Sequence, residues 1–323
     1  MSTINLKNKV VITGALDWGL GHLTRLITLM KKSEVSQWLI LATADQKKIY
    51  QKDFPKAIFY ETESLNWQWS GTQSAVKEMF RQRKKWNRQL RSDQKLVEEI
   101  VIKHKVDSIL SDNRYGLYHE NIPSIILTHQ LNLPTSLIMK SFAQKKLSRY
   151  LSPFHEIWVP DYIDHKKRLS GKLSEPPEKL QPKVHFIGPL CRFSWDEKHQ
   201  EKTGTTILLS GPEPQRKKFL LDLLTSFSSD ENLTIIAPQI YSDISLSEKQ
   251  SWLENPDEVT LQKVLKNSKT IISRAGYSTI MEIHKLQNTK KIIVPTPYQN
   301  EQNYLGKHLN GQWGFNTVNQ KNN

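Results

Sequence analysis

Short apolar strands alternate with amphipathic helices along most of the chain, and this alternation constrains the fold more than any other feature. A β-branched strand at 9–13 leads through a loop into a helix at 22–32, whose apolar residues recur at helical spacing. Further buried strands are predicted at 38–42, 57–60, 107–110, 124–127, 156–159 and 184–187. Strands joined by crossover helices form parallel sheets, so we expect an α/β fold.

The same rhythm returns in the second half of the chain. Strands are predicted at 205–209, 233–237, 270–272 and 291–294, with helices at 215–227, 260–267, 278–286 and 299–309. The polar, aperiodic stretch 195–202 is predicted to be the linker. We therefore expect two doubly wound domains, 1–194 and 203–323. Ligands bind at the carboxyl ends of such strands, which predicts a site in a cleft between the domains.

Composition narrows the choice of partners. The 323 residues include 46 Lys+Arg and 32 Asp+Glu, a net charge of +14. Such a field attracts nucleotides, nucleic acids or anionic membranes, although a basic chain without such a partner is an alternative. Cys191 is the single cysteine, which excludes an intrachain disulfide and a cysteine-built zinc site. No apolar leader or spanning segment is visible, so we expect a cytoplasmic protein.

A strongly basic stretch lies between the third and fourth predicted strands. Residues from about Gln73 to Lys105 are predicted to form one long helix or a broken pair, with Phe80, Trp86 and Leu90 among the cations. The cations are Arg81, Arg83, Lys84, Lys85, Arg88 and Arg91. One interpretation is a solvated basic face. The other is a helix that binds an anionic membrane surface or another polyanion.

The loop from residue 14 to His22 joins the first strand to the first helix. Gly19 and Gly21 permit a tight turn and the close approach of a ligand. His22 stands at the helix start, where the positive end of the helix dipole favours a neutral imidazole that can accept a proton. Asp17, at the edge of the loop, is another candidate for this chemistry. The alternative for His22 is a structural role as a helix cap.

A second loop, at 273–279, ends a strand and opens a helix. Gly276 provides the turn, and Ser278 and Thr279 provide capping hydroxyls. Phosphate oxygens would fit the free N–H groups of this helix start. Glu282 follows about one turn later, where a carboxylate could accept both hydroxyls of a ribose. The alternative for Glu282 is a solvated helix residue.

The next predicted strand is followed by a loop with two prolines and a helix that opens with amide side chains. Gln302 and Asn303 offer both hydrogen-bond donors and acceptors. These groups are suited to the hydroxyls of a sugar.

The sequence S-D-N-R-Y-G follows one buried strand of the first half, and T-H-Q follows the next. Because the carboxyl ends of parallel strands share an edge, Asp112, Arg114 and His129 are expected to be neighbours. The functional interpretation is an acceptor site that includes Asn113, with Asp112 or His22 as the general base. The alternative is an Asx turn with a surface arginine.

These motifs resemble glycosyltransferase family 28, in the UDP-glycosyltransferase superfamily. The pattern S-R-A-G-x-S-T-x-x-E-I at 273–283, followed by V-P-x-P-x-x-x-E-Q-x-Y at 294–304, is similar to the carboxyl-terminal domain of that family. The G-x-G-H loop is similar to the acceptor-side loop, and bacterial glycosyltransferase-like proteins share the D-W-G-L-G-H and S-D-N-R-Y-G signatures. The resemblance covers most of the chain and implies the GT-B fold, with two Rossmann-like domains facing a cleft.

The resemblance also implies roles for individual residues. Glu282 would bind the ribose, Gln302 and Asn303 the donor sugar, and Arg192 the donor phosphates, while His22 matches the loop histidine. The diphosphate-binding turn would consist of Gly276, Tyr277, Ser278 and Thr279. Ser210 and Gly211 match a glycine-rich loop of the family, where Pro212 and Pro214 depart from the pattern.

The implied activity is the transfer of a sugar from a UDP-sugar to an acceptor hydroxyl, with inversion and without a metal or cofactor. No D-x-D metal triplet lies at a predicted strand end. The resemblance leaves the identity of the acceptor open. A lipid-linked acceptor would suit the basic helix and a peripheral position of the protein on the inner face of the membrane. Chains of this family usually end with a helix that crosses back to the first domain. The residues after the last predicted helix are too few for such a crossing, so we expect either a truncated carboxyl terminus or a looser closure of the two domains.

Two other functions remain open at this level. A sugar-nucleotide epimerase would share the fold and the donor site but would need no acceptor. A nucleic-acid binder would use the basic helix and show steep salt dependence. The chain contains no RNA- or DNA-binding fingerprint, so we expect no nucleic-acid partner.

Overall fold

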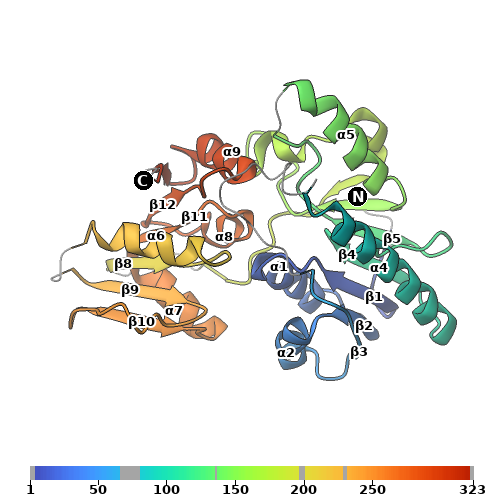
Figure 1. The fold of residues 1–323 in the computed structure, drawn as a ribbon, viewed down its shortest axis with the longest axis horizontal. Helices are drawn as coiled ribbons and strands as arrows, with labels where there is room; N and C mark the ends of the chain where they lie inside the picture. The colour runs from blue at the N-terminus through green and yellow to red at the C-terminus, as the bar shows by residue number, and fades with distance from the viewer. Residues whose placement is uncertain (1–3, 66–80, 135–136, 196–200, 228–230, 321–323) are drawn as a thin grey trace. The chain divides into compact units, whose positions relative to one another are not determined.

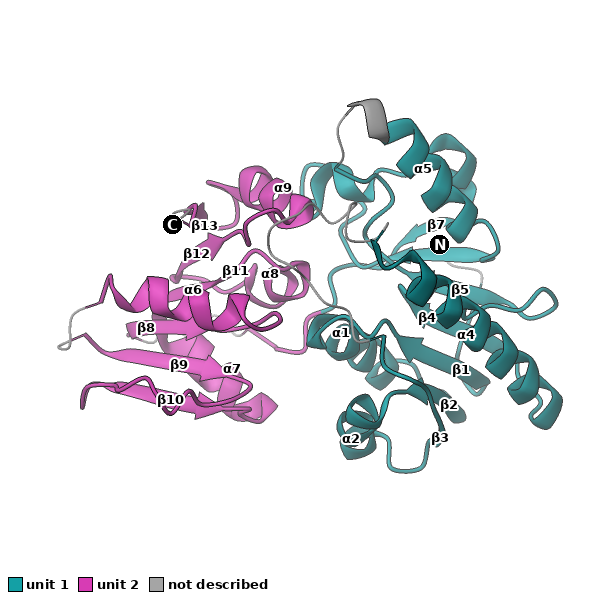
Figure 2. Ribbon diagram, in the orientation of Figure 1, with its two compact units in different colours: residues 1–68, 75–190 teal, residues 69–74, 191–323 magenta. Residues whose placement is uncertain are grey.

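The computed structural model describes residues 4–65, 81–134, 137–195, 201–227 and 231–320. These residues fall into two compact units, the first ending at Leu190 and the second beginning at Cys191 (Figure 2). The boundary therefore lies before the predicted one at 194. Cys191–Trp195 joins the second unit because the indole N–H of Trp195 donates to the carbonyl of Glu282, at 2.7 Å. Residues 196–200 of the predicted linker lie outside the described residues.

The first unit is built on a seven-stranded parallel sheet in the order β3-β2-β1-β4-β5-β6-β7 (Figure 1). The strands are β1 (Val10–Ala15), β2 (Gln37–Ala42), β3 (Ile58–Glu61), β4 (Ser108–Asp112), β5 (Ser124–Leu127), β6 (Glu156–Val159) and β7 (Val184–Phe186). The central strands β4, β5 and β6 are buried along their whole length. This burial is the reason that they read as continuous apolar runs in the sequence.

Helices pack on this sheet through apolar side chains. They are α1 (Leu20–Lys31), α2 (Ala44–Asp53), α4 (Arg83–Lys103) and α5 (Leu137–Leu151), with short 3₁₀ turns at Gly171–Ser174 and Glu178–Lys183. Helix α4 contributes Val97 and Ile100 to a core shared with β1, β2 and β4. Neither α5 nor α2 was predicted from the sequence, and the residues of α2 are mostly polar. A capping box between Thr43 and Gln46 begins this helix, and its Tyr50 is fully buried.

The second unit contains a six-stranded parallel sheet in the order β10-β9-β8-β11-β12-β13. Its strands are β8 (Thr203–Leu208), β9 (Leu233–Ala237), β10 (Gln250–Glu254), β11 (Ser268–Arg274), β12 (Lys290–Val294) and β13 (Phe315–Thr317). Its helices are α6 (Gln215–Leu224), α7 (Glu258–Asn267), α8 (Tyr277–Ile283) and α9 (Asn300–Leu309). The edge strands β10 and β13 were not predicted, because they lack the continuous apolar runs of buried strands.

Both sheets confirm the predicted pair of doubly wound α/β units. In each sheet the strand order reverses at the centre, between β1 and β4 in the first unit and between β8 and β11 in the second. Ligands of doubly wound sheets bind at the carboxyl ends of the strands flanking such a switch point. The side chains at these two edges are therefore the first candidates for function.

Candidate functional site

The switch point of the first unit brings His22 and Asp112 into contact. Ala15 ends β1 directly opposite Asp112, so the loop that follows leads into α1 beside the end of β4. Nδ1 of His22 lies 2.7 Å from Oδ1 of Asp112. An ionised carboxylate only accepts hydrogen bonds, so this contact assigns the proton to Nδ1 and the lone pair to Nε2. The side chain of His22 is 19% exposed, and its Nε2 bonds to no group among the described residues.

Arg25 holds Asp112 from the other side. Its guanidinium donates from Nε to Oδ2 and from Nη2 to Oδ1, both at 2.5 Å. Burial by itself would raise the pKa of Asp112, but the charges of Arg25 and His22 outweigh burial and hold this pKa below its usual range. Asp112 is therefore an ionised, fully engaged carboxylate, which leaves His22 as the group with a free basic nitrogen. Sequence reasoning missed Arg25, although its i+3 spacing from His22 places both on one helix face.

The helix-cap alternative for His22 is wrong. Helix α1 begins after Gly19, whose φ of 81° suits glycine, and no side chain caps its N-terminus. The imidazole instead points to a carboxylate from another strand. Gly19 thus serves the turn that delivers His22 to Asp112, whereas the predicted turn residue Gly21 lies within the first turn of α1.

His129 and Asn113 are two of the residues predicted to lie near Asp112. His129 is buried, and its Nδ1 lies 3.3 Å from Nη1 of Arg25, so it joins the His22–Asp112 cluster. Asn113 has a φ of 50°, and its side-chain oxygen is buried without a hydrogen-bond partner. His129 thus belongs to the cluster through Arg25, whereas no hydrogen bond among the described residues joins the side chain of Asn113 to it.

Arg114 has a different role from either of the two predicted. It is 5% exposed, so it is no surface arginine. Its Nε and Nη2 donate to the two oxygens of Asp93 on α4, at 3.0 and 2.7 Å, and its Nη1 donates to the carbonyl of Leu41. With every guanidinium nitrogen engaged, Arg114 joins α4 to the end of β2 and contributes to structure.

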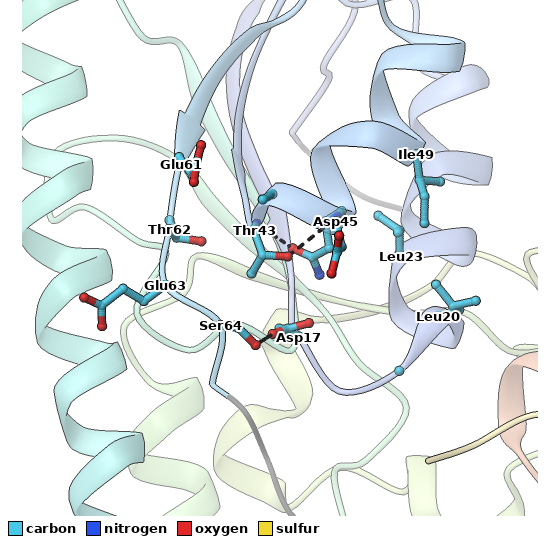
Figure 3. A pocket seen from close by; sticks show the side chains of 13 residues that line it. Asp17, Leu20, Leu23, Thr43, Asp45, Ile49, Glu61, Thr62, Glu63 and Ser64 are labelled. Carbon is cyan, nitrogen blue, oxygen red and sulfur yellow. Dashed lines mark hydrogen bonds between the residues drawn. The ribbon is translucent and has the colours of Figure 1, made fainter. Parts of the chain in front are cut away.

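Asp17 lies in a cavity of about 390 Å³ rather than against His22. This cavity, called here the Asp17 cavity, opens beside the carboxyl ends of β1, β2 and β3 (Figure 3). Asp17 accepts a hydrogen bond from the hydroxyl of Ser64, at 2.5 Å. The cavity is lined by Asp17, Gly19, Leu20, Leu23, Thr43, Ala44, Asp45, Gln46, Ile49, Glu61, Thr62, Glu63 and Ser64.

The switch point of the second unit holds a smaller cavity of about 40 Å³, called here the Arg274 cavity. It gathers four predicted donor-site residues, Ser210, Gly211, Gly276 and Gln302. It also includes residues that sequence reasoning did not select: Pro212, Gln215, Arg216, Arg274, Thr296 and Gln299. The amide of Gln302 is occupied, because its oxygen accepts from the N–H and hydroxyl of Thr296 and its nitrogen donates to Gln299.

Arg274 is the more buried of the two arginines that line this cavity. It ends β11, is 4% exposed and stacks over the ring of Phe219 at 3.8 Å. Burial lowers its pKa to about 10. Within the described ranges it forms no salt bridge and donates only to main-chain carbonyls. The sequence does contain a signal that could have identified Arg274, namely its position directly before Ala275 and Gly276 in the motif at 273–279.

The remaining donor-site residues do not line the Arg274 cavity. Nε of Arg192 donates to Oε1 of Glu282 at 2.5 Å, so the predicted phosphate and ribose ligands bind each other. Glu282 is 8% exposed, which rules out the solvated alternative. The side chain of Tyr277 is also buried. Those of Ser278, Thr279 and Asn303 are half-buried beyond the residues that line this cavity.

The basic stretch is helical where the structure describes it, and its six cations are exposed. Trp86 packs against the rings of Tyr115 and Tyr150, at 5.9 and 6.3 Å between centroids. Phe80 lies outside the described residues. Trp86 therefore faces the unit's interior, as the solvated-face interpretation requires.

No described helix combines the length and apolar character needed to cross a membrane. Within the same ranges, no group of three or more histidine, cysteine, aspartate or glutamate side chains is placed to hold a metal ion.

Comparison with known proteins gives a family match within the second unit. Residues 253–321 match the glycosyltransferase family 28 C-terminal domain. No curated protein matches the chain.

Solved structures share the fold of the whole chain. UGT89C1 from Arabidopsis thaliana, complexed with UDP-L-rhamnose, is 12% identical with a TM-score of 0.62, covering 98% of this chain and 86% of that chain. MurG from Acinetobacter baumannii is 14% identical with a TM-score of 0.53, covering 97% and 86%. A protein assigned as a UDP-N-acetylglucosamine 2-epimerase from Listeria monocytogenes is 11% identical with a TM-score of 0.53, covering 94% and 87%. The chain thus has the GT-B fold, and residues 253–321 of its second unit are similar to the glycosyltransferase family 28 C-terminal domain.

Proposed function

We propose that this glycosyltransferase moves a sugar from a UDP-sugar to an acceptor hydroxyl, by direct displacement with inversion at the anomeric carbon. The observation that carries the mechanism is the contact between His22 and Asp112. It leaves a basic nitrogen, Nε2, at the carboxyl edge of the first sheet. A UDP donor is supported by the family 28 domain and by the UDP-L-rhamnose complex of the Arabidopsis protein.

In this mechanism Nε2 of His22 takes the acceptor proton while the acceptor oxygen attacks the anomeric carbon. The bond from that carbon to the diphosphate oxygen breaks, and UDP leaves. Asp112 stabilises the imidazolium that forms, and Arg25 keeps Asp112 in place. Asp112 and Arg25 are thus positioning residues.

The Arg274 cavity suits the phosphate end of the donor. A buried guanidinium that forms no salt bridge within the described part of the chain can neutralise the charge that develops on the leaving diphosphate. Backbone N–H groups at Gly276 add donors at the start of α8. We therefore assign the leaving-group stabilisation to protein cations and N–H groups rather than to a metal.

Glu282 retains a ribose-binding role in this proposal. Arg192 engages Oε1, and Oε2 has no partner among the described residues, so it can accept from a ribose hydroxyl. Arg192 then orients the carboxylate rather than binding phosphate.

Replacing Glu282 by alanine is expected to weaken UDP binding by about 1–3 kcal/mol, because the ribose hydroxyls lose their acceptor. Calorimetric titration with UDP measures this loss, and a thermal-shift panel of nucleotides tests the donor class in the wild type. Glu248→Ala, an exposed residue outside the Arg274 cavity, is the matched control. Unchanged UDP affinity in a folded Glu282→Ala protein would remove this residue from the site.

A sugar-nucleotide epimerase is the second candidate, because the Listeria protein has the same fold. An epimerase needs no acceptor. Release of free UDP, with no glycoside formed in the presence of acceptors, would favour it over sugar transfer.

The exposed cations of α4 support weak attachment to anionic membranes, by charge alone because Trp86 is packed inward. Each cation near such a surface contributes about 1 kcal/mol. We expect co-sedimentation with anionic vesicles at about 50 mM salt, where screening is weak. Arg83→Glu with Arg88→Glu should release the protein and leave UDP binding intact.

The matched control for charge is Lys285→Glu with Lys307→Glu, two exposed residues of the second unit. It changes net charge equally and should leave vesicle binding unchanged. A wild-type protein that ignores anionic vesicles would instead favour a water-soluble acceptor.

A further inference from the structure

His129 is a buried histidine to which the transfer mechanism gives no role. It is 3% exposed and lies two residues beyond the carboxyl end of β5. Its Nδ1 is 3.3 Å from Nη1 of Arg25. A guanidinium has N–H donors and no acceptor, so Arg25 donates and Nδ1 accepts. The contact therefore requires a neutral imidazole with its proton on Nε2, because a proton on Nδ1 would face the N–H of Arg25.

His22 contacts the same guanidinium in the opposite tautomer. Its Nδ1 is 3.1 Å from Nη2 of Arg25, and both nitrogens donate to Oδ1 of Asp112, at 2.7 and 2.5 Å. The contact between the two nitrogens is therefore a meeting of two donors at one oxygen rather than a hydrogen bond. His22 thus keeps its lone pair on Nε2, whereas His129 presents its lone pair from Nδ1.

Arg25 links the two histidines as a rigid group. Its Nε and Nη2 bind the two oxygens of Asp112, and its Nη1 reaches His129. A guanidinium is planar and its donors form a fixed fork, so an acceptor on Nη1 restricts the plane that contains the other two donors. The orientation of that plane determines where Oδ1 of Asp112 meets Nδ1 of His22. A change at His129 would therefore reach the base through Arg25.

The main chain holds His129 in place on both sides. The N–H of Thr128 donates to the carbonyl of Trp158 at 3.0 Å, and the N–H of Leu131 donates to the carbonyl of Leu173 at 2.8 Å. Supports of this kind keep a side chain within the narrow range of positions that a catalytic cluster needs. Nδ1 of His129 is thus a fixed acceptor.

We propose that His129 is a positioning residue for the general base. Its neutral Nδ1 orients Arg25, and Arg25 in turn orients Asp112 toward His22. The consequence for sugar transfer rests on the proposed function, whereas the positioning itself does not. His129 contacts neither donor nor acceptor in this assignment, so it differs from the acceptor-site role that the sequence suggested.

His129→Asn and His129→Gln test the acceptor directly, because the two amides place their oxygens differently. The side-chain oxygen of asparagine takes the place of Nδ1, whereas that of glutamine lies near the place of Nε2. His129→Asn should therefore keep the cluster intact, and His129→Gln should disturb it. His129→Leu has no acceptor and should behave like His129→Gln, so it replaces that variant if glutamine prevents folding.

Proton NMR of the imidazole N–H groups measures the positioning without donor or acceptor. The Nδ1 proton of His22, which is bound to Asp112 at 2.7 Å, should give a low-field signal that is absent from His22→Ala. This signal should persist in His129→Asn and should broaden or vanish in His129→Gln. A wild-type protein without the signal would contradict the cluster and overturn the inference.

Kinetics measure the consequence for transfer, as UDP release from UDP-glucose or UDP-N-acetylglucosamine. We expect kcat to fall by about 10–100-fold in His129→Gln, because a small misplacement of a catalytic group costs on that order. In His129→Asn kcat should stay within about threefold, and UDP affinity should stay within about twofold in both variants, because the donor-binding groups are unchanged.

His155→Leu is the matched control. Nδ1 of His155 also accepts a hydrogen bond, from the N–H of Ser124 at 3.1 Å, but this contact lies at the opposite end of β5. Its loss should leave both kcat and the His22 signal close to those of the wild type. Thermal unfolding of each variant verifies that it is folded.

The outcomes separate this inference from the proposed function. A normal kcat and an unchanged His22 signal in His129→Gln would overturn the inference. Equal losses in His129→Asn and His129→Gln would also overturn it, because packing rather than an acceptor would then explain them. The expected signals without any sugar transfer by the wild type would remove the proposed function and leave the positioning role.

Discussion

Replacing His22 by alanine is expected to lower turnover by about 10²–10⁴-fold, the usual contribution of a general base. The affinity for UDP should stay within about twofold, because the substitution removes a group that acts only in the transition state. The reason is structural: Nε2 of His22 is a basic nitrogen without a partner among the described residues, and Asp112 and Arg25, which hold the ring, are engaged with each other. Steady-state kinetics and UDP calorimetry measure the two quantities.

His119→Ala is the matched control for this prediction. His119 belongs to the same unit but contacts Glu98, at 3.5 Å, rather than Asp112. Its replacement should leave turnover close to normal. If His22→Ala keeps near-normal turnover, the base lies elsewhere, and Asp17 becomes the next residue to test.

Replacing Arg114 by leucine is expected to destabilise the protein by about 3–5 kcal/mol, because it leaves the buried carboxylate of Asp93 without its partner. The two side chains are 6% and 1% exposed. Packing around them is tight: a Cβ on Gly116 would lie 2.6 Å from the Cβ of Asp93. Denaturant unfolding at neutral pH measures the loss.

The double substitution Arg114→Leu with Asp93→Leu distinguishes a charge effect from a packing effect. It removes both charges, so it should recover much of the stability lost in the single variant. Arg91→Leu, which removes an exposed cation of the same helix, should change stability by less than about 0.5 kcal/mol. A loss below about 1 kcal/mol in Arg114→Leu would contradict the structural role of this pair.

The fold could be predicted from the sequence because the patterns that indicate strands and helices are local in the chain. A strand buried on both faces needs a run of apolar residues, and a helix packed on one side needs apolar residues at helical spacing. The chain satisfies both rules at β4, β5 and α1, so the two doubly wound units could be predicted. The rules fail where burial is partial, which is why α2 and the edge strands β10 and β13 were missed.

The candidate site depended on tertiary structure, because its contacts join residues far apart in the chain. The sequence by itself placed His22 at the start of the first helix and Asp112 at the end of a strand, and it made both of them candidates for the general base. Only the structure showed that these residues, 90 positions apart, touch, that Arg25 completes the cluster, and that Arg114 turns away to Asp93. The pairing of Arg192 with Glu282 was equally invisible. Spacing in a sequence determines which face or edge a side chain occupies, whereas the choice among charged partners depends on distances and burial that only the packed chain sets.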